Sequence, residues 1–228
     1  MAYLFFRPSK LHLLVESREL NTPWLLATTK VHIGNAALGL GDTAQAQTYL
    51  EQAHILSQEI NEEWLITFVL NNYGEVSRVQ GEYDQARIYY EQSEELLREM
   101  GDKGELARLV HNLGYIALHK GDLVQARILF RDSLAMFLKL SNQRGIAECL
   151  AAMAGLWAEE GEFEASAQLL GAASALLGQT GGSWWPADRV EYERNLLKIK
   201  DGLARDVFEA TWKAGQGMTL DETTAFVG

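Results

Sequence analysis

The sequence predicts an all-α solenoid of antiparallel helical hairpins, and two observations predict it. A glycine followed by an acidic residue recurs every 40 residues, at Gly41, Gly81, Gly121 and Gly161. A fixed period of this size is typical of stacked supersecondary units. The 228 residues contain only 3 prolines, and alanine, leucine, glutamate and glutamine are abundant, which favours helices. No stretch sustains the apolar/polar alternation of a strand.

The charge and cysteine content exclude several classes of protein. The formal net charge of -11 opposes direct binding to the phosphates of nucleic acids. No basic tract suits a membrane surface, and no apolar run approaches the roughly 18 residues of a membrane-spanning helix. The single cysteine, Cys149, lies among alanines and leucines, which favours a packed core thiol and a reducing compartment. We therefore expect a cytoplasmic protein without a membrane segment.

The first segment, residues 1–20, is predicted to be a partial repeat. Residues around Ser17 and Trp24 recur 40 positions later around Ser57 and Trp64, so residues 3–20 correspond to the second helix of a preceding hairpin. The first helix of that hairpin is absent from the sequence. The apolar face of the remaining helix would therefore be uncovered, and we expect either a longer protein or self-association at this end.

Residues 21–180 are predicted to form four hairpins. In the second hairpin, apolar residues follow a helical spacing on both sides of Gly81, which can adopt the left-handed conformation that ends a helix. Each helix would have about 16–19 residues and a length of about 25–28 Å. Small residues recur at one position in each helix, which predicts close helix contacts: Gly34, Gly74, Gly114 and Ala154 in the first helices, and Ala46, Ala86, Ala126 and Ser166 in the second.

Residues 181–228 are predicted to form a C-terminal helical cap. The 40-residue period stops before the glycine-rich GQTGGSWWPADR, in which Pro186 can begin a helix. Helices are expected at about 187–200 and 202–214, and Thr219 with Glu222 forms a capping box that begins a last short helix. Trp184 and Trp185 either anchor a partner or pack over the last hairpin.

Two of the hairpins, NNYGEVSRVQGEYDQARIYYEQS and HNLGYIALHKGDLVQARILFRDS, resemble the tetratricopeptide repeat family. The resemblance covers roughly residues 22–178, although the period is 40 and not 34, and the proline that often closes each unit is missing. The period alone also suits HEAT repeats, but the Gly-acid pair with its aligned alanines favours tetratricopeptide repeats. The resemblance implies a right-handed superhelix whose first helices line the concave side.

The tail carries a second resemblance. The segments LLGAASALL, EYERNLLKIKDGL and FEATWKAGQGMTLDETTAFV resemble the C-terminal region of bacterial STAND-class ATPases and LuxR-type regulators. In those proteins a nucleotide-binding motor precedes a tetratricopeptide arm. The resemblance implies that this chain is the sensor or interaction arm of a signalling or transcriptional regulator.

The candidate binding site is the concave side of the first helices. Amides, arginines and a tyrosine there could bind the backbone of an extended peptide. The resemblance places these candidates on that side: Asn35, Asn71, Asn72, Glu75, Arg78, Arg108, His111, Asn112 and Tyr115.

Part of the candidate site is similar to the carboxylate clamp of the family. Asn35, Asn72 and Arg108 match it, whereas Val31 and Asn112 replace two of its basic residues, which argues against carboxylate binding. The repeated asparagines Asn72 and Asn112 have an alternative structural role, which is a hydrogen bond to a neighbouring turn.

Other candidates also have structural alternatives. Arg78 and Arg108 either contact a ligand or form ion pairs between repeats or with solvent-exposed acids. His111 and Tyr115 either face the groove or pack within it.

No motif predicts catalysis, a cofactor or a metal. The sequence lacks the Gly-x-x-x-x-Gly-Lys loop of ATPases, and His111 and His119 would lie about 12 Å apart along a helix, too far for one metal ion. We therefore expect a non-enzymatic scaffold that binds a protein or peptide in its concave groove. The alternatives are a self-association module and a small-molecule sensor whose ligand lies among tryptophan, tyrosine and asparagine side chains.

Overall fold

The computed structural model describes residues 23–227. These residues form eleven α-helices and no strand, so the all-α solenoid predicted from the sequence is confirmed. The partial repeat predicted at residues 1–20, and with it the expected uncovered helix, lies outside the described residues.

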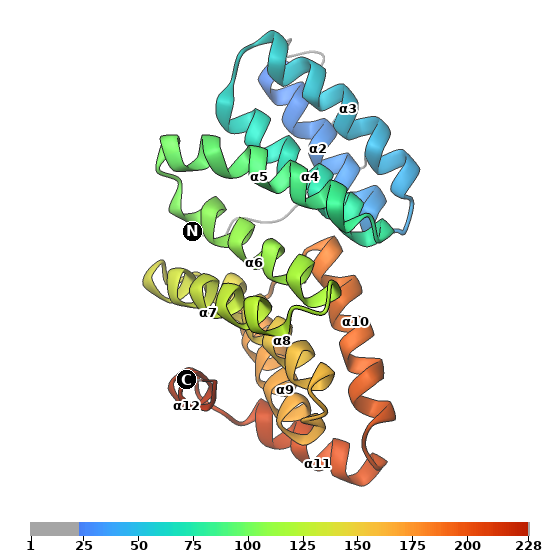
Figure 1. Ribbon diagram of the computed structural model, residues 1–228, viewed down its shortest axis with the longest axis vertical. Helices are drawn as coiled ribbons and strands as arrows, with labels where there is room; N and C mark the ends of the chain where they lie inside the picture. The colour runs from blue at the N-terminus through green and yellow to red at the C-terminus, as the bar shows by residue number, and fades with distance from the viewer. Residues whose placement is uncertain (1–22, 228) are drawn as a thin grey trace.

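Eight of the helices form four consecutive hairpins, which follow one another along the long axis of the molecule (Figure 1). In each hairpin the two helices pack closely along their length. The pairs are α2 (Pro23–Gly39) with α3 (Thr43–Glu59), α4 (Glu63–Gln80) with α5 (Tyr83–Met100), α6 (Lys103–His119) with α7 (Leu123–Lys139), and α8 (Gln143–Glu159) with α9 (Phe163–Gln179).

The turns repeat every 20 residues, which is half the period seen in the sequence. The four predicted glycines lie inside the hairpins with left-handed φ angles between 79° and 87°. A second set of left-handed residues lies between the hairpins, where the left-handed conformation does not always require glycine. This second set is Asn61, Gly101, Ser141 and Gly181.

The acid after each glycine has a capping role in only two of the four hairpins. Asp42 and Asp122 accept a hydrogen bond from the backbone N–H three residues later, which satisfies a free donor at the start of a helix. Glu82 and Glu162 occupy the same position without a side-chain capping bond.

The aligned small residues make room for bulky neighbours, as predicted. A methyl group at Gly74 would overlap the ring of Tyr90, and one at Gly114 would lie 2.5 Å from the ring of Phe130. Both rings are fully buried. The cost of about 1 kcal/mol for glycine within a helix is therefore offset by the packing of an aromatic ring between the two helices.

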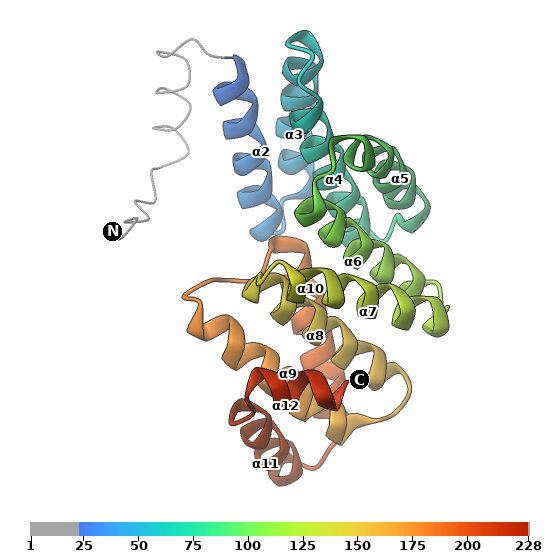
Figure 2. The ribbon, with the colours of Figure 1, turned by 90° about the vertical axis from the view of Figure 1, so that its left-hand side faces the viewer.

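The tail forms three helices: α10 (Pro186–Asp201), α11 (Arg205–Gln216) and α12 (Leu220–Phe226). α11 and α12 pack on α9 at the end of the stack, and the capping box of Thr219 and Glu222 begins α12. α10 does not lie at the end of the stack, where the C-terminal cap was expected. It contacts α2, α4, α8 and α9, and so runs along the side of the stack formed by the first helices (Figures 1 and 2).

The sequence of α10 explains this position. From Asp188 onwards its buried residues are spaced three or four apart, so they share one face of the helix, and most of that face is polar, with the apolar Ile199 at its end. Such a face suits a polar groove better than the apolar end of a solenoid. The buried residues are Ala187, Asp188, Glu191, Asn195 and Ile199.

Candidate functional site: the inner groove

The inner groove is lined by the first helices of the hairpins and is occupied along part of its length by α10. All of the candidates predicted from the sequence are buried, each with at most 7% of its surface exposed. They include the charged and amide side chains of α4 and α6, which a helix in contact only with apolar neighbours would not retain. These residues are Asn35, Asn71, Asn72, Glu75, Arg78, Arg108, His111, Asn112 and Tyr115.

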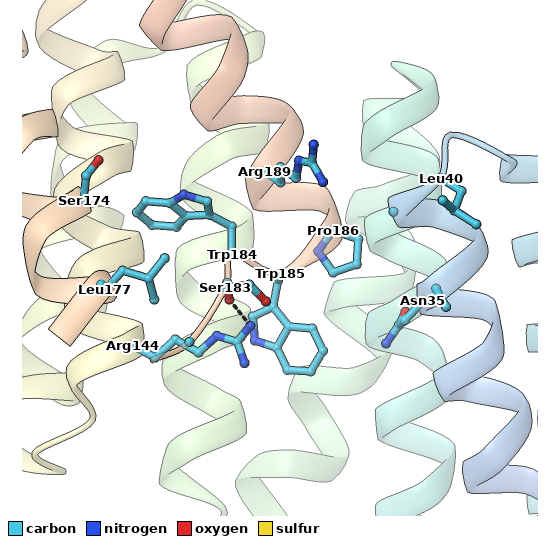
Figure 3. A pocket seen from close by; sticks show the side chains of 14 residues that line it. Asn35, Leu40, Arg144, Ser174, Leu177, Ser183, Trp184, Trp185, Pro186 and Arg189 are labelled. Atoms are coloured by element: carbon cyan, nitrogen blue, oxygen red, sulfur yellow. Dashed lines mark hydrogen bonds between the residues drawn. The ribbon is translucent and has the colours of Figure 1, made fainter. Parts of the chain in front are cut away.

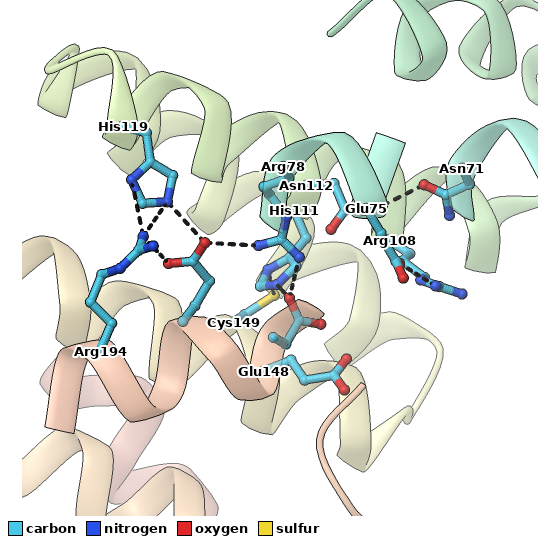
Figure 4. Close-up of polar contacts among 12 residues, drawn as sticks. Asn71, Glu75, Arg78, Arg108, His111, Asn112, His119, Glu148, Cys149 and Arg194 are labelled. Atoms are coloured by element: carbon cyan, nitrogen blue, oxygen red, sulfur yellow. Dashed lines mark hydrogen bonds and ion pairs between the residues drawn. The ribbon is translucent and has the colours of Figure 1, made fainter. Parts of the chain in front are cut away.

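Arg78 is the centre of the contact with α10 (Figure 4). Its Nη2 donates a hydrogen bond to Oδ1 of Asp188 at 2.8 Å, and its Nη1 lies 3.6 Å from Oε1 of Glu191. The guanidinium group stands over the ring of Tyr115, with 4.4 Å to the ring centroid. Arg78 and both acids are almost completely buried. The three charged groups have therefore lost most of their contact with water and interact with each other and with the ring of Tyr115.

Two histidines of α6 face the same acids. His111 Nε2 lies 3.5 Å from Oδ1 of Asp188, and His119 Nε2 lies 2.9 Å from Oε1 of Glu191. Arg194 donates a hydrogen bond from Nη1 to the other carboxylate oxygen of Glu191 at 3.0 Å. Both carboxylates of α10 are thus surrounded by cationic or ionisable nitrogen groups.

The surroundings keep both acids of α10 ionised. Burial alone would raise the pKa of Asp188, but the charges of Arg78 and His111 and their hydrogen bonds hold it well below its ordinary value. Burial likewise opposes ionisation of Glu191, yet the hydrogen bond from His119 and the charge of Arg78 lower its pKa. The docking of α10 therefore includes buried ion pairs, beside the apolar contacts of Ile199, Tyr192 and Leu196 with the core.

Arg108 joins two hairpins and also contacts the segment before α10. It forms a buried ion pair with Glu75 of the preceding hairpin, which agrees with the structural alternative considered for this residue. Its guanidinium group also lies against the ring of Trp185, 4.2 Å from the centroid, and Arg144 of α8 lies 4.5 Å from the same centroid.

The asparagines of the groove bond within the solenoid. Asn72 donates to the backbone carbonyl of Phe68 at 2.6 Å, and Asn112 donates to Oδ1 of Asn71 at 3.1 Å. The structural alternative, a bond to a neighbouring turn, describes Asn72, which bonds the preceding turn of its own helix, whereas Asn112 bonds a side chain of the preceding hairpin. Cys149 is fully buried beside His111 and Ser133, and burial raises the pKa of its thiol.

Several buried polar atoms of the groove have no hydrogen-bond partner among the described residues. Leaving such a group unpaired costs about 1–3 kcal/mol, so a groove that retains several has unused capacity for hydrogen bonds. These atoms include Nδ2 of Asn35 and Asn71, Oδ1 of Asn72 and Asn112, Oε2 of Glu75, and Nε of Arg78 and Arg108.

One end of the groove remains open as a pocket of about 750 Å³ between α2 and the connection from α9 to α10 (Figure 3). Asn35 lies in its wall, and it is the one predicted candidate in the lining of this pocket. Other lining residues are Arg144, Ser174, Leu177, Trp184, Trp185 and Arg189.

Sequence reasoning identified the groove residues but missed their partners in the tail. Asp188 and Glu191 lie outside the 40-residue pattern and 110 or more residues beyond Arg78. One signal could have revealed them. The inner positions of α4 and α6 carry two arginines and a histidine, and buried cations require anions from somewhere in the chain.

The described residues include no group of three or more histidine, cysteine or acidic side chains arranged to bind a metal ion. Within residues 23–227, no helix combines the length and the apolar character needed to cross a membrane.

Comparison with known proteins finds a family match over part of the chain. Residues 25–99 match the model of the tetratricopeptide repeat family. These repeats generally mediate protein–protein interactions and have no catalytic role of their own. No curated protein matches the chain.

Solved structures that share the fold include the following two. One is BtubC (BKLC) from P. vanneervenii, with a TM-score of 0.61 and 18% sequence identity, covering 96% of this chain and 88% of that protein. The other is a STAND signal-transduction ATPase with a tetratricopeptide repeat sensor from Pyrococcus horikoshii, with a TM-score of 0.58 and 15% identity. That match covers 95% of this chain and 31% of the ATPase.

Proposed function

We propose that this tetratricopeptide repeat protein is the protein-binding arm of a bacterial signalling or transcriptional regulator, and that its inner groove binds a helical segment with acidic residues three positions apart. The observation that carries the proposal is α10 itself. The groove holds a helix whose Asp188 and Glu191 are contacted by Arg78 and two histidines.

The balance of contacts supports an exchangeable occupant of the groove. A segment held mainly by apolar burial behaves as a fixed part of the core, whereas α10 buries few apolar side chains and two charged ones. A partner helix with the same acidic spacing could satisfy the same cations and displace α10. This would use the candidate residues Arg78, Arg108 and His111 as a binding surface.

The regulator context is supported by resemblance alone. The STAND ATPase of P. horikoshii has a tetratricopeptide repeat sensor, and this chain shares that fold over most of its length. The tail sequence also resembles the regulators described above. In such a protein, binding in the groove would bias the state of an attached effector domain.

The binding function can be tested by supplying α10 as a separate peptide. A fluorescein-labelled peptide of residues 184–202 is added to the full chain and to the variant Asp188→Asn/Glu191→Gln, and fluorescence anisotropy is measured. The variant loses the charges that hold its own α10, so the peptide should bind the variant at least tenfold more tightly than it binds the unmodified protein.

Two controls decide the outcome. The same peptide carrying the Asn and Gln replacements should bind neither protein, because it lacks both carboxylates. Circular dichroism checks that the variant remains helical. If the acidic peptide fails to bind a helical variant, or binds as well as its neutral counterpart, the groove does not recognise acidic helices.

The regulator context and the alternative have their own tests. A phosphate-binding Gly-x-x-x-x-Gly-Lys segment encoded upstream of Met1 in the same reading frame would support the regulator. For the self-association module, sedimentation velocity across a wide concentration range should show a dimer. A monomer at the highest concentration would argue against that module.

A further inference from the structure

We propose that the pocket at the open end of the groove is a binding site for an organic carboxylate with an apolar body. This pocket lies beside the acidic face of α10, and Pro186 and Arg189 of its lining belong to α10, so the site exists while α10 is docked in the groove. The proposal specifies the ligand class for the small-molecule alternative derived from the sequence.

The pocket has the size and composition of a ligand site. Its volume of about 750 Å³ falls within the roughly 300–1,000 Å³ typical of sites for small molecules. Leu177 and the rings of Trp184 and Trp185 supply apolar wall, while Asn35 and Ser174 supply polar groups (Figure 3). Mostly apolar walls with a few convergent polar groups are typical of such sites.

The charge of the pocket is opposite to that of the protein. The chain has a net charge of -11, yet the side chains that line this pocket include two arginines, Arg144 and Arg189, and no aspartate or glutamate. An anion approaching a cavity lined in this way meets local positive charge on a protein whose net charge is negative.

The charge of Arg144 is incompletely neutralised by its neighbours. Its Nε donates to Glu148 at 3.2 Å, and its Nη2 donates to the backbone carbonyl of Ser183. Burial and the nearby charge of Asp188 raise the pKa of Glu148 to about 8, so this carboxyl group is largely protonated at neutral pH. A ligand carboxylate would supply the negative charge that Glu148 does not.

The other polar groups are also available. Among residues 23–227, the ion pair of Arg189 is with Glu193 on its own helix, at 2.8 Å between two exposed side chains, a contact worth little in water. Two arginines therefore line the same space, and the side chain of Asn35 belongs to its wall.

A ligand in this pocket would contact both ends of the stack. Asn35 belongs to the first hairpin, whereas Trp184, Trp185 and Arg189 belong to the segment after the last hairpin. Occupancy would therefore add contacts that hold α2 against α10.

The test uses a matched pair of fluorescent probes on the full chain. Anilinonaphthalene sulfonate is an aromatic anion, and N-phenylnaphthylamine is nearly the same molecule without the charged group. The anion should bind saturably with a stoichiometry of one, and at least tenfold more tightly than the neutral probe. Equal affinity for the two probes would overturn the proposal, because it would indicate an apolar patch.

Variants locate the probe. Arg144→Gln/Arg189→Gln should weaken binding of the anion at least tenfold, and the exposed Arg189→Gln alone at least threefold. Arg98→Gln is the matched control, since Arg98 is an exposed arginine paired with Glu94 and lies outside the pocket lining. It should leave the affinity unchanged. A loss of the same size in Arg98→Gln, or no loss in Arg189→Gln, would overturn the site.

Competition identifies the source of the carboxylate. Indole acetate stands for a small carboxylate, and a pair of identical hexapeptides, one with a free and one with an amidated C-terminus, stands for a chain end. Displacement of the bound anion by indole acetate or by the free-acid peptide alone assigns the source. If neither carboxylate displaces it, the pocket does not bind carboxylates.

Discussion

The first and second helices of each hairpin have nearly the same length but very different surroundings. In the second hairpin, α4 buries twelve of its 18 residues, whereas α5 buries four of its 18. In the third, α6 buries nine and α7 five. The first helices are covered by neighbouring hairpins and by α10, and the second helices face solvent on one side. Position in the stack, more than helix length, therefore determines burial.

The last hairpin shows that a neighbour can change this pattern. α9 is a second helix, yet it buries eight of its 17 residues because α11 packs against it. The glycines Gly171 and Gly215 allow this contact, since a methyl group on either would overlap backbone atoms of the opposite helix. The solenoid is thus covered at two places, along the groove by α10 and at its end by α11.

The largest effect should come from removing the central cation of a first helix. Arg78→Ala leaves Asp188 and Glu191 buried without their main partner, and breaking a buried ion pair in this way costs about 3–5 kcal/mol. Urea denaturation should show this loss of unfolding free energy, and α10 should lose protection in hydrogen exchange first. A loss below about 1 kcal/mol would mean that the ion pairs of Arg78 contribute little to the stability of the inner face.

An effect of at most similar size is expected from pH, through a buried acid of another first helix. The pKa of Glu148 lies near 8 in the folded protein and at the ordinary 4.5 when unfolded. The folded state therefore keeps a proton that the unfolded chain releases, so stability falls as pH rises from about 5 to 8, by at most about 1.4 kcal/mol per pH unit. Glu148→Gln cannot lose this proton and should flatten the decline.

Urea midpoints of the native protein and of Glu148→Gln, measured at pH 5 and pH 8, provide the comparison. Asp188 and Glu191 act in the opposite direction, because their pKa values are lowered, and their contribution is lost only at more acidic pH. Parallel declines in the two proteins would show that Glu148 is not the group responsible.

The next prediction concerns α9, the second helix that is covered by α11. Gly215→Ala places a methyl group against the backbone carbonyl of Gln168, and α11 must move away from α9, at a cost of about 1–3 kcal/mol. Gly178→Ala is the control on α9, where a methyl group meets no atom within 4 Å. It should stabilise by about 0.5–1 kcal/mol through higher helix propensity. Thermal unfolding of the two variants should therefore shift in opposite directions.

The smallest effect is expected on an exposed second helix. Arg87 pairs with Glu91 at 2.6 Å, with about half of each side chain exposed. Such pairs contribute about 0.3–0.5 kcal/mol, so Arg87→Ala should barely change the urea midpoint. A loss comparable to that of Arg78→Ala would remove the distinction between the two faces.

The fold could be predicted largely from the sequence because its determinants are local. The glycines at 40-residue spacing, the small residues facing Tyr90 and Phe130, and the capping box of Thr219 each act within one or two helices. The second set of turns escaped notice because Asn61 and Ser141 adopt the left-handed conformation without being glycine. At these turns, the residue type does not reveal the left-handed backbone conformation.

The position of α10 could not be predicted in this way. Its contacts join Asp188 to Arg78 and Glu191 to His119. In each pair the acid lies outside the repeats and far in sequence from its partner. A repeat pattern in the sequence predicts contacts between neighbouring hairpins. α10 runs back along the hairpins but is not part of any repeat, so the pattern does not predict its contacts. The candidate residues of the groove were therefore recognised as inward-facing, while their partner within the chain was not.

The length of α10 limits how this protein can evolve. With 16 residues, α10 is about 24 Å long, and it contacts both the first hairpin at α2 and the last at α9. Repeat proteins commonly gain or lose units by duplication and deletion. An added hairpin would move α2 and α9 farther apart than the length of α10. A change in the number of hairpins would therefore require a simultaneous change in the length of α10.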